Sequence, residues 1–161
     1  MRPFFPERMS TKKILDSRKL LSATVKTDLK ELNVLYKGLM KKHHPDRFTD
    51  EVERTQAEET SKHIIDAYHF LVSIHPETHA TNKEEFERTA TTSVISDWRY
   101  KSMTLHLIFG DGSEYEYFGV PQNVYNKFVN NNGNLRFARR HILGAFNFRR
   151  VKKAEAGTTE N

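Results

Sequence analysis

The spacing of apolar residues changes near the middle of this chain of 161 residues. Up to about residue 75, apolar residues recur every three or four positions, which is the period of an amphipathic helix. From Ser93 onward they alternate with polar residues, which is the period of a half-buried strand. We therefore expect the class α + (α+β): a helical hairpin, then a separate domain of about three antiparallel strands with a packed helix.

Composition fits two small cores better than one large core. Hydrophobic residues make up 37% of the chain and charged residues 29%, and small domains expose more of their surface than large ones. Between the two patterns the chain is polar and without clear periodicity. The expected parts are an N-terminal arm at 1–11, a helical domain at 12–76, a linker at 77–92, an α+β domain at 93–151 and a disordered tail at 152–161.

Two amphipathic helices dominate the first part. The segment 25–42 places its leucines on one broad arc and four lysines on another face, namely Lys26, Lys30, Lys37 and Lys41. Thr24 is the expected N-cap, and Pro45 ends the helix because its ring cannot continue the hydrogen-bond ladder. A second helix is expected from about residue 51 to 72, closed by Pro76. A shorter helix is expected around 12–21.

The loop between these helices reads His43-His44-Pro45-Asp46-Arg47-Phe48. Together with Ala67-Tyr68 and Leu71 on the following helix, it resembles the J-domain of the DnaJ family over roughly residues 12–76. His44, Pro45 and Asp46 match that family's His-Pro-Asp tripeptide, and the four lysines match its basic second helix. Two features depart from the family. Lys13-Ile14-Leu15-Asp16 replaces a Tyr-rich opening, and His75-Pro76 replaces Asp-Pro.

The resemblance implies a co-chaperone that docks on a DnaK-type (70-kDa heat-shock class) ATPase and stimulates its ATP hydrolysis. A cytoplasmic location is expected because the sequence shows neither a secretory signal nor a membrane-spanning segment. The chain itself would not be an enzyme. A lysine face would steer it towards a negative surface, and an aspartate in the loop would pair with an arginine of the ATPase. Lysine faces are often only solvated, and a proline after a helix is often only a stop. The implied contact residues are His44, Pro45, Asp46, Lys26, Lys30, Lys37, Lys41 and Arg47.

The second part predicts a small sheet. Strands are expected around Val94–Tyr100, 105–109 and 115–117, with a tight turn at Gly110-Asp111-Gly112-Ser113. Pro121 then opens a helix. The run from Gly112 to Tyr125 resembles the KTSC domain, a short module named for its place at the C-terminus of some lysyl-tRNA synthetases. The ending fits that family too, through Phe137, Arg140, Ile142, Gly144, Phe146 and Phe148.

The KTSC family has no assigned activity, so the residues must suggest one. No acidic residue lies between Arg136 and Ala154, and phenylalanines are interleaved with the cations. Such a pattern suits RNA, through phosphate contacts and stacking, although the phenylalanines are more often core. Binding of a peptide or client protein remains open equally, and so does an RNA-binding protein that only tethers a chaperone. The candidate nucleic-acid contacts are Arg136, Arg139, Arg140, Arg149 and Arg150.

Several other chemistries find no support in the sequence. The chain has no cysteine, which excludes disulfides and thiolate metal sites. Of the eight histidines, His75 and His79 are four apart, but Pro76 separates them. No phosphate-binding loop, nucleophile motif or membrane-spanning segment is present. We therefore expect no metal, no cofactor, no enzyme activity and no membrane partner. The net charge of +5 fits an acidic protein or a nucleic acid equally.

Overall fold

The computed structural model describes residues 12–155, which belong to two compact units divided at residues 80 and 81. The expected arm at 1–11 and residues 156–161 of the expected tail lie outside the described residues. Each unit is described by itself below. Within residues 12–155, no helix is both long enough and apolar enough to span a membrane.

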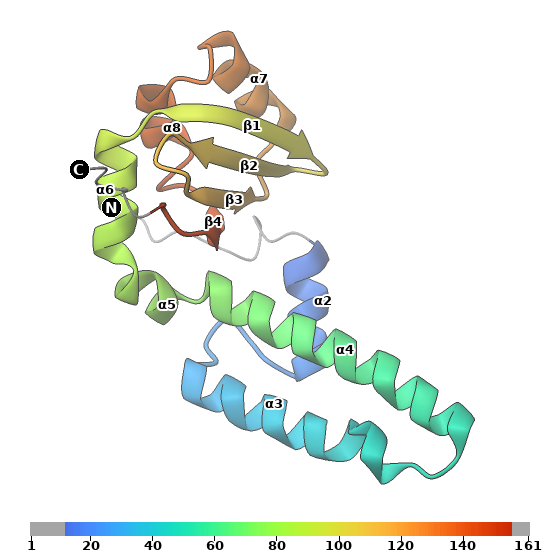
Figure 1. Ribbon diagram of the computed structural model, residues 1–161. Helices are drawn as coiled ribbons and strands as arrows, with labels where there is room; N and C mark the ends of the chain where they lie inside the picture. Colours follow the sequence, from blue (N-terminus) through green and yellow to red (C-terminus); the bar gives the residue numbers. More distant parts are fainter. Residues whose placement is uncertain (1–11, 156–161) are drawn as a thin grey trace, which may run out of the picture. The chain divides into compact units, whose positions relative to one another are not determined.

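The first unit is helical, as expected. It contains α2 (Lys12–Leu21), α3 (Leu29–His43), the single 3₁₀ turn η1 (Pro45–Arg47) and α4 (Glu51–Ile74). Figure 1 shows α3 and α4 as an antiparallel hairpin joined through η1, and α2 packs on α4. Rings of Tyr36 and Tyr68 stack across the hairpin with centroids 4.1 Å apart. The core of this unit comes mainly from α2 and α4 and includes Ile14, Leu21, Leu32, Ile64, Phe70 and Leu71.

The start of α3 differs from the prediction. The helix begins at Leu29, and its N-cap is Asp28, whose carboxylate accepts the Glu31 N–H at 2.8 Å while Glu31 reaches back to the Asp28 N–H. This reciprocal capping box outcompetes Thr24, whose hydroxyl instead accepts the Lys26 N–H in the preceding turn. Lys26 therefore lies before the helix and is not part of its lysine face.

Residues 77–92 were expected to form a polar linker, but they are helical. They belong to α5 (Pro76–Thr81) and α6 (Lys83–Thr92). Thr89 and Ala90 of α6 are buried, and the Phe86 ring stacks on Phe148 with centroids 4.8 Å apart. Too few apolar residues lie on α6 for its periodicity to be visible, and its burial depends on a sheet formed later in the chain.

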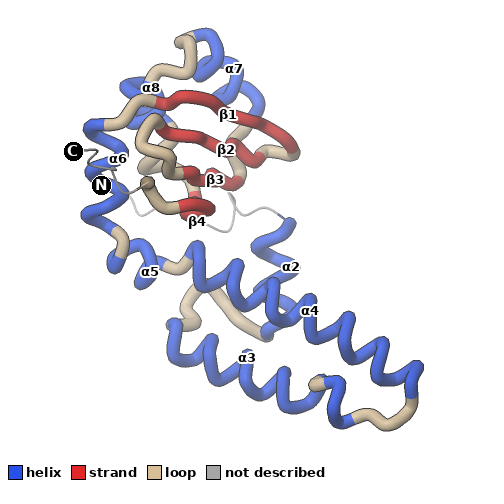
Figure 2. The backbone as a smooth tube through the Cα atoms, viewed as in Figure 1, coloured by secondary structure: helices blue, strands red, loops and turns tan. Residues whose placement is uncertain are grey.

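The second unit is built on a four-stranded antiparallel sheet, one strand more than expected. Its strands follow chain order as β1 (Ile95–Lys101), β2 (Thr104–Phe109), β3 (Glu114–Phe118) and β4 (Asn147–Lys152). Between β3 and β4 lie α7 (Gln122–Asn130) and α8 (Leu135–His141). Figure 2 separates the strands from these helices by colour. The domain was expected to end at residue 151, with a disordered tail from 152. The fold continues past this point, because Lys152 pairs with Glu114 and the Glu155 N–H bonds to Asp111 O.

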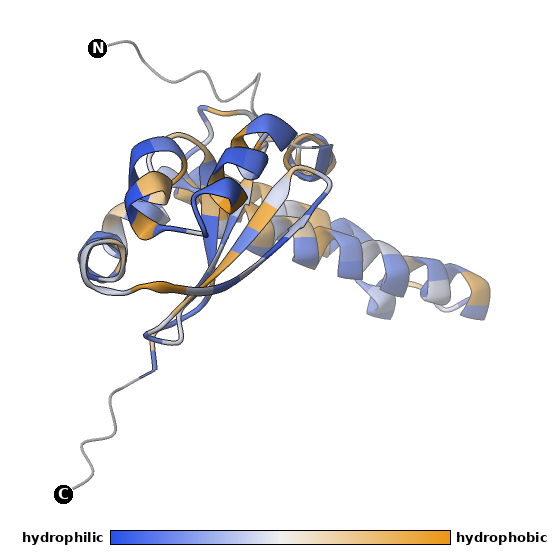
Figure 3. Cartoon of the chain, turned by 90° about the horizontal axis from the view of Figure 1, so that it is seen from above, coloured by the Kyte–Doolittle hydropathy of each residue, from blue (hydrophilic) through white to orange (hydrophobic). Residues whose placement is uncertain are grey.

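One face of the sheet packs against helices. Alternate residues of β2 and β3 point into this core, and α6, α7 and α8 contribute Ala90, Phe128 and Ala138. Figure 3 colours each residue by its hydropathy, and hydrophobic and hydrophilic residues follow one another along the strands and helices. Phe137, Phe146 and Phe148 all belong to this core or pack against it, so they are not exposed stacking platforms.

Candidate functional site

The loop between α3 and α4 presents the predicted tripeptide. Proline at position 45 has no N–H, so α3 ends at His43, and His44 adopts an extended backbone with φ −64° and ψ 132°. Pro45 then opens η1, where its fixed φ favours a helical turn. The side chains of His44 and Asp46 are 50% and 91% exposed. The loop therefore offers an imidazole and a carboxylate to solvent from a short, constrained segment.

The two ring nitrogens of His44 have different roles. Nδ1 accepts the backbone N–H of Asp46 at 3.2 Å and so caps η1. This hydrogen bond assigns the proton of the neutral ring to Nε2. The Asp46 carboxylate lies 3.5 Å from the same Nδ1. His44 thus uses one nitrogen within the loop and leaves an N–H donor for another molecule.

Arg47, predicted to contact the chaperone, turns back onto its own loop. Its guanidinium donates to Lys41 O at 2.9 Å. In an uninterrupted helix, the N–H of residue 45 would bond this carbonyl, but proline has none. Arg47 therefore satisfies the carbonyl that Pro45 leaves open.

Three of the four predicted lysines share one face of α3. Lys30, Lys37 and Lys41 are exposed and are spaced by seven and four residues, which places them above one another on a helix. Val34 lies among them and is also exposed. Lys26 precedes the helix, as described above. The cationic face therefore runs from Lys30 towards the tripeptide, with the exposed Val34 between Lys30 and Lys37.

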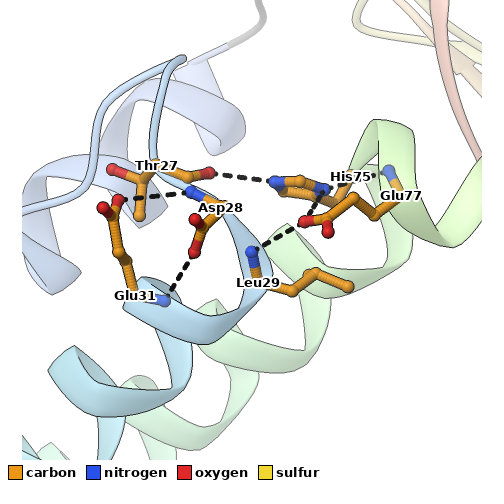
Figure 4. Close-up of polar contacts among 6 residues, drawn as sticks. All are labelled: Thr27, Asp28, Leu29, Glu31, His75 and Glu77. Carbon is orange, nitrogen blue, oxygen red and sulfur yellow. Dashed lines mark hydrogen bonds and ion pairs between the residues drawn. The ribbon is translucent and has the colours of Figure 1, made fainter.

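A polar network that the sequence did not reveal fixes the start of α3 (Figure 4). The Glu77 carboxylate accepts the Leu29 N–H at 2.9 Å, and His75 Nε2 lies 2.9 Å from Thr27 O. A carboxylate at this position also interacts favourably with the positive end of the helix dipole. The His75 ring ties the end of α4 to the turn before α3. The partners are 48 residues apart, so no local pattern could have indicated them.

In the second unit, the structure divides the predicted arginine cluster. Arg149 bonds to Glu116 at 2.8 Å and Arg150 pairs with Glu85. These two arginines are neutralised within the domain. Across the same sheet, His106 lies between Glu114 and Glu116, with nitrogen–oxygen distances of 3.1 and 3.7 Å.

The remaining three arginines lie on α8. Arg136, Arg139 and Arg140 are exposed. Within residues 12–155 their side chains form no described ion pair or hydrogen bond. Spacings of three and four residues bring them to one side of the helix. Of the five predicted arginines, the three on α8 therefore remain as a candidate basic surface.

The glycine-rich turn between β2 and β3 is held by α6. The Asp111 carboxylate accepts the Thr89 hydroxyl at 2.6 Å, and also the backbone N–H and hydroxyl of Ser113. Burial raises the pKa of Asp111, but the hydrogen bonds from Ser113 and Thr89 outweigh this effect, so the pKa lies below its ordinary value. Asp111 is a structural carboxylate that links α6 to the sheet.

Two buried tyrosines complete the electrostatics of this unit. Burial raises the pKa of Tyr115 to about 12, partly opposed by Arg150. Burial also holds the pKa of Tyr117 well above its ordinary value. Neither hydroxyl has a hydrogen-bond partner among the described residues. No group of three or more histidine or carboxylate side chains in residues 12–155 is arranged to hold a metal ion.

Comparison with known proteins gives one family. The KTSC domain model matches residues 91–146. The comparison supplies no family match for the J-domain resemblance of the first unit. No curated protein and no solved structure matches the chain. The structural unit is longer than the family match, because α6 begins at Lys83 and β4 ends at Lys152. A KTSC domain is found at residues 91–146 of this chain.

Proposed function

We propose that residues 12–80 act as a J-domain-type co-chaperone module that docks on a DnaK-type ATPase and stimulates its ATP hydrolysis. The observation that carries the proposal is the exposed His44-Pro45-Asp46 loop at the end of a helix with a lysine face. Pro45 and the His44 cap restrict this loop before binding, which lowers the entropy lost on docking. The module would bias the ATPase towards its hydrolysing state by binding that state better.

The chemistry of the surface fits this docking. Lys30, Lys37 and Lys41 would attract an acidic surface and raise the rate of encounter. The Asp46 carboxylate would then form a charge-assisted hydrogen bond with an arginine of the ATPase. Nε2–H of His44 would donate a further hydrogen bond. No covalent step on this chain is required.

The test is single-turnover ATP hydrolysis by a DnaK-type protein with and without the full chain. His44→Gln and Asp46→Asn should each abolish stimulation and leave the circular dichroism spectrum unchanged, because both residues lie on an exposed loop. His63→Gln is the matched control, since His63 is an exposed histidine of α4 outside the loop. Absence of stimulation by the unaltered chain would reject the proposal.

For the KTSC domain we propose a targeting role, in which it binds a client protein or RNA. The observation that favours nucleic acid is the α8 surface formed by Arg136, Arg139 and Arg140. Three phosphate contacts on a single strand predict a log–log salt slope of about −2. An RNA-binding protein that uses the first unit only as a tether is the second candidate function.

RNA binding measured at several salt concentrations distinguishes these readings. Replacing Arg136, Arg139 and Arg140 by glutamine should abolish binding and its salt dependence, whereas Arg149→Gln should preserve both because Arg149 is already paired with Glu116. Salt-insensitive capture of unfolded polypeptide, without RNA binding, would favour a client protein as the ligand.

A further inference from the structure

We infer that Ser61 of α4 is a positioning residue that holds the His44-Pro45-Asp46 loop in its presented conformation. The consequence for chaperone stimulation rests on the function proposed above. The effect on the loop can be measured without any partner. Ser61 lies on the apolar face of α4 and is 5% exposed. Its hydroxyl donates to the backbone oxygen of His43 at 2.8 Å.

The need for this hydrogen bond follows from how α3 ends. In a continuing helix, His43 O would accept the N–H of residue 47. Here the Arg47 N–H bonds to His44 O instead, because η1 is a tighter 3₁₀ turn. His43 O is therefore left without its helical donor, and it is the carbonyl directly before the tripeptide. Ser61 supplies the missing donor from the neighbouring helix.

A second contact holds the other end of the loop. Arg54 Nε of α4 donates to Phe48 O at 3.3 Å. The tripeptide therefore lies between two backbone oxygens, of His43 and Phe48, that are both held by side chains of α4. Arg54 is long and sits on an exposed turn, whereas Ser61 has one rotatable carbon–carbon bond and is buried. The Ser61 contact is the more rigid of the two anchors.

Removal of the Ser61 hydroxyl would leave His43 O without a donor at a partly buried position. Loop conformations that expose this oxygen to water would then gain population. The partner binds only the presented conformation, so its apparent affinity falls in proportion to the population of that conformation. Contacts made after docking stay the same, so the maximal stimulated rate is preserved.

The test uses the full chain labelled with ¹⁵N and three variants. Ser61→Ala removes the hydroxyl, and Ser61→Thr keeps it. Ser17→Ala is the control, because Ser17 is a serine of α2 that is 8% exposed and makes no described contact with the loop. Ser61→Ala should shift or broaden the amide resonances of His44, Asp46 and Arg47. Ser17→Ala should leave them unchanged, and Ser61→Thr should restore them.

Stimulation assays then separate positioning from stability. Ser61→Ala should raise the chain concentration for half-maximal stimulation roughly fivefold, as expected for one lost hydrogen bond, without changing the maximal rate. Unchanged loop resonances in Ser61→Ala would overturn the inference. If Ser61→Thr does not fold, the comparison of Ser61→Ala with Ser17→Ala still decides it. If the unaltered chain does not stimulate while the resonances shift as expected, the proposed function fails and the positioning role stands.

Discussion

The ring of Trp98 on β1 lies directly against the backbone of Gly133, which lies three residues past the end of α7 at Asn130. A Cβ at position 133 would overlap Trp98 Cζ3 and Cη2. Gly133 also has φ +62°, a conformation that side-chain-bearing residues rarely adopt. Trp98 packs edge-on against Phe128 of α7, with centroids 5.1 Å apart. One glycine thus lets the end of α7 approach the sheet.

Gly133→Ala should therefore lower the free energy of unfolding of the second unit by about 2 kcal/mol or more, from the left-handed backbone and the overlap together. Urea unfolding followed by fluorescence measures this, since Trp98 is the single tryptophan of the chain. The control is Gly144→Ala, where a Cβ meets no atom within 4 Å. Equal midpoints for the two variants would show that the close packing is absent.

Acid should weaken the second unit through Asp111. Its pKa is lower in the folded chain than its ordinary value, so folding favours the charged carboxylate. The stabilisation is complete above the ordinary pKa of about 3.9 and is lost as pH falls through the lower folded pKa. Asp111→Asn should cost about 1–2 kcal/mol at pH 7 and reduce this acid dependence. Unfolding at pH 2–7 tests it, and an identical pH profile in the variant would contradict the assignment.

Two tyrosine hydroxyls should behave in opposite ways. The Tyr117 hydroxyl is buried without a partner among the described residues, so Tyr117→Phe should leave stability unchanged or raise it by up to about 1 kcal/mol. The Tyr100 hydroxyl donates to Val120 O at 2.7 Å, so Tyr100→Phe should lower stability by about 1 kcal/mol. Thermal unfolding of both variants provides the comparison. A larger loss of stability for Tyr117→Phe than for Tyr100→Phe would mean that the Tyr117 hydroxyl forms a hydrogen bond.

Two substitutions at His44 separate the roles of its nitrogens. His44→Asn keeps an acceptor near the position of Nδ1 and should preserve the Asp46 amide resonance. Its side chain is too short to place a donor at the position of Nε2. His44→Gln places its amide near the position of Nε2 but loses the acceptor that caps η1, so the Asp46 amide resonance should shift. Neither variant should stimulate the ATPase, because only the ring serves both functions at once. Full stimulation by His44→Asn would show that Nε2–H contacts no partner.

Charge reversal on α3 should slow association with the DnaK-type ATPase more than it changes the maximal stimulated rate of ATP hydrolysis. Lys37→Glu with Lys41→Glu removes the cationic face, so the association rate constant should fall about tenfold or more at low salt and lose its salt dependence. Stopped-flow binding measures both quantities. Lys19→Glu with Lys62→Glu gives the same net charge on exposed residues of α2 and α4. Equal effects of the two pairs would show that net charge, rather than the α3 face, controls association.

Periodicity and punctuation made much of this architecture predictable. The helices expected around 12–21 and 51–72 follow from repeating apolar residues. Pro45 marks the end of α3, and Pro76 marks the end of α4. The tight turn at Gly110–Ser113 and the helix after Pro121 follow from turn chemistry and the fixed φ of proline. These features depend on neighbours within a few residues, so local sequence patterns are enough to predict them.

Tertiary structure alone decided the features that depend on distant partners. β4 is a strand because it pairs with β3, and its run Asn147-Phe148-Arg149-Arg150 shows no clear alternation. Arg149 and Arg150 resemble Arg139 and Arg140 in sequence, yet only the first two have carboxylates beside them in the fold. Ser61 likewise gains its role from a carbonyl 18 residues away. Local patterns determine which helices and turns can form, whereas ion pairs and long-range hydrogen bonds depend on which segments the folded chain brings together.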